Sequence, residues 1–205
     1  MKNYPRGSEW RRWDLHVHTP ASGLNNQFPK TNDGGPDWEQ YVTALETIND
    51  VAALGVTEYF SVEGYTKLRE LQASGRLSNF DLLLPNVELR LSHIMGQKRL
   101  NMHVIFSDEL SVETIEDDFL RELKFTCQAS PDDKDDRWSV KRSALEDLGK
   151  RLKSEHSQFQ DRSDYEIGCM NAVVNMEDVV TTLSNNKFRK KYVVVLAEEN
   201  TSMAS

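Results

Sequence analysis

Hydrophobic and polar residues follow two periods along this chain, a period of two that is typical of strands and a period near 3.6 that is typical of helices. The period of two is clearest over residues 13–18, where tryptophan, leucine and valine alternate with polar side chains. In a regular strand this alternation directs the apolar residues to one face and Asp14, His16 and His18 to the other. The run predicts a short strand with one face for packing and one for polar chemistry.

The two periods alternate over the rest of the chain. A loop rich in glycine, asparagine and proline covers residues 20–36, and apolar residues then recur at helical spacing from Asp37 to Gly55. The other expected strands are residues 56–62, 80–91 in two pieces around Pro85, 100–106 and 192–196, and the other expected helices are 65–74, 111–124, a periodic one from Ser139, and 176–183. The last strand is a continuous apolar run of the type that is covered on both faces. This order predicts an α/β protein with a largely parallel sheet or barrel.

The length and composition indicate one folded domain. A chain of 205 residues, 38% hydrophobic and 28% charged, can form one sizeable core, and we expect residues 1–10 to be a loose arm ahead of a domain over 11–205. No apolar run is long enough for a membrane span or a signal peptide, so we expect a soluble, cytoplasmic protein that does not act at a membrane. Cys127 and Cys169 are too far apart in the sequence for a zinc knuckle or a redox pair, and we expect reduced thiols.

The net charge of −8 argues against a general nucleic-acid coat protein, which usually carries a basic footprint. This net charge does not exclude a local basic patch. The candidates are Lys2, Arg6, Arg11 and Arg12 before the first strand and Lys187, Arg189, Lys190 and Lys191 before the last strand. We interpret the second cluster as a solvated surface, whereas the first leads into the histidine strand. Residues 128–137 hold four aspartates but lack the glycine and register of a calcium loop, which favours a solvated loop.

Residues able to carry chemistry gather where the predicted strands end. They are His16 and His18, then Glu58 and Glu63, then Glu88 and Arg90, with His103 inside the fourth strand. In folds with parallel strands, sites form at the carboxyl ends of the strands. Imidazoles mixed with carboxylates suit zinc, manganese or iron, whereas an all-oxygen set would suit magnesium or calcium. The alternative for the histidine pair alone is a strand face that points at solvent, because His-x-His is a short pattern with many chance matches.

Three segments together resemble the PHP domain, the polymerase and histidinol phosphatase family. They are residues 14–19 (DLHVHT), 55–60 (GVTEYF) and 86–88 (NVE). Residues 58–65, 85–91 and 103–106 are similar to the PHP-like N-terminal region of TrlF-type proteins, which carry an SMC-like or AAA-like ATPase after it and are associated with bacterial defence against phage. The resemblance covers residues 9–107 well and the remainder weakly.

This resemblance implies a distorted (β/α)7 barrel that holds two or three metal ions and hydrolyses phosphoesters. His16 and His18 match the opening His-x-His pair of the family. Glu88 matches the glutamate that bridges metals, and His103 matches the next histidine ligand. The expected cofactors are therefore divalent ions of manganese, zinc or iron.

The chain departs from the family pattern in two respects. Glu58 stands where the family has aspartate, and Tyr59 stands where many members have a metal-binding histidine, which weakens the second metal position because tyrosine is a poor ligand unless ionised. The family closes its site with a late Asp-x-His motif, which does not occur before Ser205. Either the chain is the front part of a longer protein or the site is incomplete, and we favour the former, with an ATPase region beyond Ser205.

The function that the resemblance implies is a nuclease module that acts on DNA or RNA and is gated by an ATPase region on the same chain or on a partner. The expected metal ligands are His16, His18, Glu58, Glu88 and His103. Arg90 is the expected phosphate contact, with a structural ion pair as the alternative. Glu63 is the expected catalytic proton acceptor, with capping of the following helix as the favoured alternative.

Two other functions fit the same residues. A PHP-like module whose site is eroded at Tyr59 would bind a partner or sense nucleic-acid ends without catalysis. A small-molecule phosphatase is favoured by the acidic balance, whereas the basic arm and the long loop over residues 20–36 favour a nuclease. A homo-oligomer is compatible with each of these functions.

Overall fold

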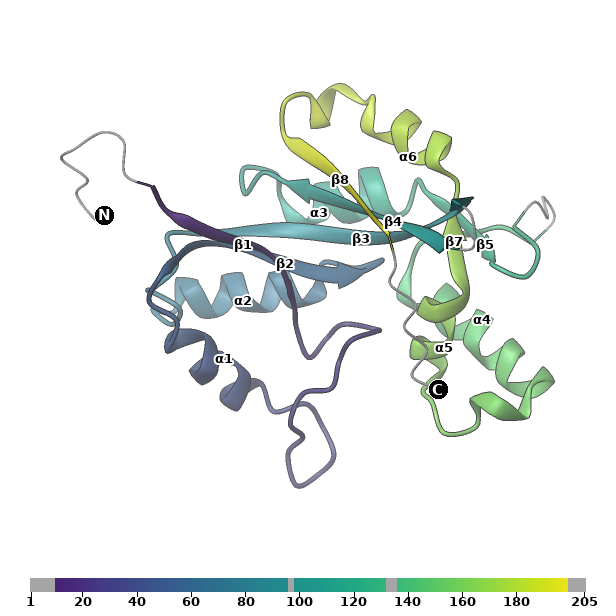
Figure 1. The fold of residues 1–205 in the computed structure, drawn as a ribbon, viewed down its shortest axis with the longest axis horizontal. Coiled ribbons are helices and arrows are strands. Elements are labelled where there is room, and N and C mark those ends of the chain that lie inside the picture. Colours follow the sequence, from purple (N-terminus) through teal and green to yellow (C-terminus); the bar gives the residue numbers. More distant parts are fainter. Residues whose placement is uncertain (1–9, 96–97, 132–135, 199–205) are drawn as a thin grey trace.

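The computed structural model of the chain describes residues 10–95, 98–131 and 136–198. These residues form an α/β fold of eight strands in one sheet with six α-helices (Figure 1), which confirms the predicted α/β class, but the sheet is mixed and not largely parallel as predicted. The strands are β1 (Arg12–His18), β2 (Val51–Tyr59), β3 (Leu82–Met95), β4 (Lys98–Phe106), β5 (Lys124–Cys127), β6 (Trp138–Ser139), β7 (Ala172–Val174) and β8 (Tyr192–Glu198). The helices are α1 (Trp38–Glu46), α2 (Glu63–Ala73), α3 (Val112–Ile115), α4 (Arg142–Glu155), α5 (Asp164–Asn171) and α6 (Met176–Leu183), with short π or 3-10 segments η1 (Glu116–Leu120), η2 (Ser157–Phe159) and η3 (Asn186–Phe188).

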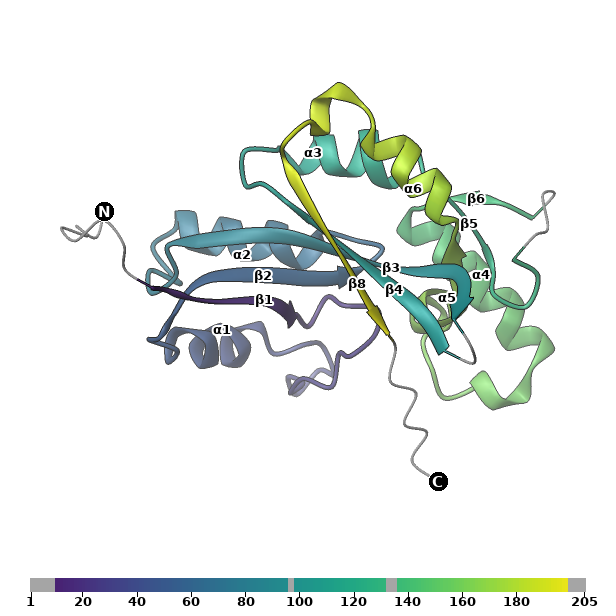
Figure 2. The same ribbon diagram turned by 45° about the horizontal axis from the view of Figure 1, so that its top comes forward.

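The sheet mixes parallel and antiparallel pairs. β1, β2 and β3 run parallel in that order, β4 folds back antiparallel on β3, and β8 lies antiparallel against β4. β3 also pairs a second time, because Leu91 near its far end faces Val174 of β7, which continues to β5 and β6. β3 therefore joins both parts of the molecule (Figure 2), and the described strands form an open sheet.

The core lies between the sheet and its helices. α1 and α2 connect the parallel strands β1, β2 and β3 and lie on the same side of them (Figure 1), as right-handed crossovers require. Val87, Leu89 and Leu91 of β3 are fully buried. In the other part of the molecule, α4 and α5 pack together at Gly149 and Gly168, where an added Cβ would overlap the facing backbone. Asn86, Glu88 and Arg90 alternate with these apolar residues in β3 and therefore point to the opposite face of the sheet.

The helix predicted up to Gly55 is wrong in its second half. α1 ends at Glu46 and β2 begins at Val51. The apolar run that starts at Val51 fits both the helical and the strand period, and strand pairing decides between them. Leu54 pairs with β1 on one side and with Leu83 of β3 on the other. Consecutive residues of β2 are buried, so both faces of the strand are covered. Gly55 therefore lies inside a strand instead of ending a helix.

β3 runs unbroken through Pro85, whereas the sequence predicts two pieces. The ladder with β4 begins at Asn86, so the missing N–H of Pro85 falls outside it. The strand expected over residues 100–106 is confirmed as β4, and the helices expected near residues 65, 139 and 176 are confirmed as α2, α4 and α6. The helix expected over 111–124 is shorter, because α3 and η1 end at Leu120 and β5 starts four residues later.

The prediction that the last strand is covered on both faces is wrong. β8 pairs with β4 along its length and forms an edge of the described sheet. Val193 and Leu196 point to opposite faces of the strand, yet their exposed fractions are 62% and 52%. The apolar run identifies a strand correctly, but within the described residues no element covers either of its faces.

The basic arm before β1 is described only in part. Lys2 and Arg6 lie outside the described residues, as do three of the aspartates within residues 128–137. Arg11 and Arg12 each form an ion pair with an aspartate, and the distance from Arg12 Nη1 to its partner is 2.6 Å. Carboxylates at the same edge of the sheet therefore partly neutralise these two cations.

Two further expectations concern thiols and membranes. Cys127 and Cys169 are free and buried, which confirms the prediction of reduced thiols. The helices that the structure describes are all too short or too polar to cross a bilayer.

Candidate metal centre

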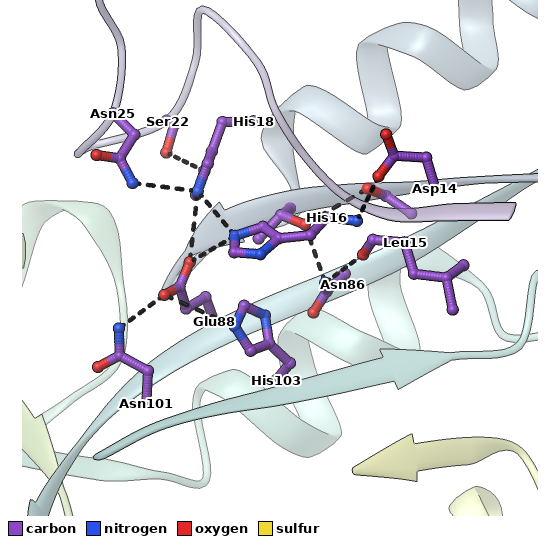
Figure 3. A network of polar contacts seen from close by, with 12 residues as sticks. Asp14, Leu15, His16, His18, Ser22, Asn25, Asn86, Glu88, Asn101 and His103 are labelled. Atoms are coloured by element: carbon purple, nitrogen blue, oxygen red, sulfur yellow. Dashed lines mark hydrogen bonds and ion pairs between the residues drawn. The ribbon is translucent and has the colours of Figure 1, made fainter. Parts of the chain in front are cut away.

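Strand pairing brings the predicted ligands of three strands together. Tyr59 of β2 faces Glu88 of β3, and Glu88 in turn faces His103 of β4. His18 ends β1 opposite Thr57, two residues before Tyr59 and on the same face of β2. Paired residues of neighbouring strands share a face, so His18, Glu88 and His103 lie on one side of the sheet (Figure 3).

His16 joins them through an irregularity in β1. Asp14 pairs with Leu54 and Val17 pairs with Val56, so the two residues Leu15 and His16 stand opposite the single residue Gly55. This is a β-bulge, and it breaks the regular alternation that the sequence predicts between Asp14 and His18. Such a bulge re-aims the side chains that it contains.

Three of these side chains converge to within ligand distance of one another, and His18 adjoins two of them, His16 and Glu88. Ligand atoms of His16, Glu88 and His103 all lie within 4.8 Å of one another. Glu88 Oε2 is 3.6 Å from His16 Nε2 and 3.5 Å from His18 Nε2, and the two Nε2 atoms are 3.2 Å apart. On the other oxygen, Glu88 Oε1 lies 3.8 Å from His103 Nε2. Figure 3 shows the imidazoles gathered around this carboxylate.

One buried atom in this group indicates what the cluster can hold. Glu88 Oε2 is buried and has no hydrogen-bond partner among the described residues, although buried carboxylate oxygens are normally paired. Its neighbours are the Nε2 atoms of His16 and His18, each of which offers a lone pair to a metal in the tautomer that carries the proton on Nδ1. A cation between these atoms would satisfy all of them. The set of imidazoles and one carboxylate therefore fits a divalent ion such as zinc, manganese or iron.

Further polar residues, which the sequence reasoning missed or read differently, hold the cluster in place. Asn101 donates to Glu88 Oε1 at 2.8 Å, and the hydroxyl of Ser22 lies 3.2 Å from His18 Nδ1. The ring of Tyr59 stacks on His18 with 5.5 Å between centroids, and its hydroxyl hydrogen-bonds Glu88. Asn101 had a signal in the sequence, because it lies two residues before His103 and therefore on the same strand face. Ser22 lies in an irregular loop and had none.

The electrostatics favour a metal-binding protonation state at Glu88, His18 and His103, but not at His16. Burial alone would raise the pKa of Glu88, but the neighbouring imidazoles of His16 and His103 and the hydroxyl of Tyr59 together lower it. Burial lowers the pKa of His18 and of His103. The pKa of His16 is raised, mainly by the adjacent carboxylate of Glu88. Near neutral pH the site therefore presents an ionised carboxylate beside two imidazoles whose neutral form is favoured.

Glu58, which the sequence reasoning adds to the ligand set, lies apart from the cluster. It neighbours Tyr59 in β2, and because successive side chains alternate, only Tyr59 points toward Glu88. The Glu58 carboxylate accepts a hydrogen bond from the hydroxyl of Thr19 and lies against Gly64 in the first turn of α2. Burial raises the pKa of Glu58 to about 8.

Glu63 and Arg90 have structural partners outside the cluster. Glu63 is the first residue of α2, where a carboxylate is favoured by the helix dipole, and it pairs with Arg142 at 2.7 Å. Arg90 donates to the carbonyl of Met170 at the end of α5 at 2.6 Å. The position of Glu63 fits the alternative of a helix start, whereas the Arg90 contact is a bond to a backbone carbonyl and not the ion pair that the sequence left open.

Comparison with known proteins identifies no relative of this chain. Neither a scan against protein-family models nor a search of curated proteins found a match for this chain. The functional interpretation therefore depends on the geometry and chemistry of the cluster around Glu88.

Proposed function

We propose that this chain is a metal-dependent phosphoesterase of the PHP type, with His16, His18, Glu88 and His103 as the residues that hold the metal. The observation that carries the proposal is the buried Oε2 of Glu88, which has no hydrogen-bond partner among the described residues and lies between the Nε2 atoms of two imidazoles. A shared carboxylate among histidines on one face of a sheet is the donor set that such hydrolases need. The distorted barrel of that family is part of the same proposal.

The roles of the chain's own residues follow from their burial. His18, Glu88 and His103 lie on the buried side of the cluster, whereas the side chain of His16 is 55% exposed. Substrate therefore approaches from the side of His16, and the buried residues exclude water from the opposite side. When bound, the metal would supply a water of lowered pKa and would stabilise the charge on the departing oxygen. Asn101 and Tyr59 fix the orientation of Glu88 throughout.

The substrate class that we propose is a nucleic acid, and the chain would then be a nuclease module linked to an ATPase in defence against phage. Trp10 is fully exposed and Trp13 is largely exposed at the start of β1, next to Arg11 and Arg12. Exposed indoles beside cations are the kind of surface on which unpaired bases stack. This surface supports a polymeric substrate over a small phosphomonoester.

A second candidate is a PHP-like module that binds without catalysis. The observation that favours it is Tyr59, whose ring covers one face of His18 and whose hydroxyl is bound to Glu88. A histidine at that position would offer a ligand for a further metal, whereas this tyrosine supplies a hydrogen bond instead. If more than one metal is needed for hydrolysis, the centre would keep a metal and lack activity.

Elemental mass spectrometry of the purified chain tests the metal centre. We expect a stoichiometric divalent metal in the parent and its loss in the His16→Ala/His18→Ala variant. The matched control is His93→Ala/His156→Ala, which removes two histidines outside the cluster and should retain the metal. A parent that stays empty after incubation with zinc, manganese and iron would contradict the proposal.

Hydrolysis assays on the metal-loaded chain then separate the functions. Cleavage of plasmid, single-stranded DNA or tRNA that is lost in the His16→Ala/His18→Ala variant supports a nuclease. Turnover of a generic phosphomonoester without cleavage of any polymer supports a small-molecule phosphatase. A loaded chain that cleaves neither substrate but binds nucleic acid supports the second candidate.

A further inference from the structure

We propose that Asn86 is a positioning residue for the metal ligand His16, and that it acts through the backbone of Leu15. The inference rests on the metal centre proposed above and names the residue that fixes its most exposed ligand. It does not depend on which phosphoester the centre cleaves.

His16 needs such support because packing does not hold its side chain. More than half of that side chain is exposed. Its ring contacts are other members of the cluster, with centroids 5.1 Å from His18 and 4.6 Å from His103. A side chain this exposed takes its direction chiefly from the backbone that carries it. The conformation of the backbone at His16 therefore decides whether its Nε2 reaches Glu88.

That backbone is the bulge over Gly55. Leu15 and His16 together face one residue of β2, so the regular ladder of hydrogen bonds is interrupted there. Gly55 makes the bulge possible, because a Cβ at this position would overlap the backbone of Leu15. A bulge leaves a backbone group without its usual strand partner, and a buried group of this kind needs another partner.

Asn86 supplies that partner from two strands away. Its Nδ2 donates to the carbonyl oxygen of Leu15 at 2.8 Å and to Thr57 Oγ1 at 2.9 Å (Figure 3 shows the contact with Leu15). Asn86 is 1% exposed, so its amide is held firmly within the sheet. It also lies two residues before Glu88 in β3, on the same face. One buried side chain thus ties the bulge that carries His16 to the strand that carries the shared carboxylate.

Loss of this amide frees the bulged carbonyl. In Asn86→Leu, a side chain of similar size removes the donor, so Leu15 loses the bond that fixes it over Gly55. We expect His16 to sample directions away from Glu88, and metal affinity to fall by about 10- to 100-fold, the usual effect of removing a residue that orients a metal ligand. Asn86→Ser, whose shorter side chain withdraws the donor from Leu15, is the second variant if Asn86→Leu does not fold.

The test is a double-mutant cycle read out by calorimetric titration of zinc and manganese into the full chain. Asn86→Leu is measured in the parent and in a His16→Ala background, in which His18, Glu88 and His103 remain. If Asn86 acts through His16, its substitution should weaken binding in the parent and change it less than about threefold in the His16→Ala background. The matched control is Asn79→Leu, since Asn79 donates to the backbone carbonyls of Leu45 and Ile48 but lies in the turn before β3, outside the cluster.

The outcomes are distinct. Asn79→Leu should lower the unfolding midpoint without changing metal affinity. An Asn86→Leu variant that binds metal as tightly as the parent, or that loses the same factor in both backgrounds, overturns the positioning role and leaves the metal centre standing. A parent that binds no metal overturns both the centre and this inference.

Discussion

The carboxyl group of Glu58 sets a pH dependence of stability that a single substitution should remove. Its side chain is fully buried; one oxygen accepts from Thr19, and Oε2 has no hydrogen-bond partner among the described residues. Burial raises the pKa from 4.5 to about 8 in the folded state. The folded protein therefore keeps a proton on Glu58 at pH values where the unfolded chain has released it.

The sign and size of the effect on stability follow from the difference between the pKa of Glu58 in the folded and in the unfolded state. Below about pH 4.5 the group is protonated in both states and does not affect stability. Above that pH the unfolded state is favoured by about 1.4 kcal/mol per pH unit, until the folded protein also ionises near pH 8. The destabilisation is about 3 kcal/mol at pH 7 and about 5 kcal/mol above pH 8. Glu58→Gln keeps the shape and the acceptor for Thr19 but cannot ionise, so it should be more stable than the parent by these amounts.

Urea unfolding followed by circular dichroism between about pH 4.5 and about pH 9 measures the effect. We expect the advantage of Glu58→Gln to grow with pH and to level off above pH 8. The control is Glu70→Gln, which removes an exposed carboxylate of α2 and should change stability by less than about 0.5 kcal/mol across the range. A Glu58→Gln variant that is less stable than the parent at high pH, or whose advantage does not vary with pH, would refute the claim that burial governs this group.

Two further predictions concern the tyrosine of the cluster and the edge strand. Tyr59→Phe keeps the ring on His18 but removes the hydroxyl that bonds Glu88. Zinc titration should therefore show an affinity about 10-fold weaker, with an unchanged unfolding midpoint. An unchanged zinc affinity would argue that Asn101 alone orients the carboxylate. Val193→Thr in β8 should alter the free energy of unfolding by less than about 0.5 kcal/mol because the side chain is largely exposed, whereas Leu89→Ala should cost about 2–5 kcal/mol. Equal losses in urea unfolding would mean that β8 is covered in solution.

The sequence predicts an element well where its pattern fits one period only. β4 and α6 are cases of this kind, and the structure has both at the expected positions. The run from Val51 fits a helix and a buried strand equally, and only its pairing with β1 and β3 decides for β2. In β8 the apolar run predicts the strand, but which neighbours cover a strand is a property of the whole fold and does not appear in the local pattern.

The candidate site likewise depends partly on the local sequence pattern and partly on strand pairing, which the local pattern does not contain. Placing ligands at strand ends selects His18 and Glu88, and the family resemblance adds His103; the register of β1 to β4 brings the three onto one face. Placement at strand ends was not enough to choose between Glu58 and Tyr59, because adjacent residues at the end of one strand point to opposite faces. The alternation of β2 gives Tyr59 to the cluster and buries Glu58 on the other side.

The histidine pair itself depends on residues outside its motif. In a regular strand, side chains two residues apart share a face but stand about 7 Å apart along the strand, as set by the rise per residue. Here the Nε2 atoms of His16 and His18 are 3.2 Å apart, on a strand with a bulge over Gly55. A His-x-His pattern is therefore a weak predictor of a metal centre by itself. In this chain the pair depends on two residues of other strands, Gly55 of β2, which lies under the bulge, and Asn86 of β3, which donates to the carbonyl of Leu15 just before His16.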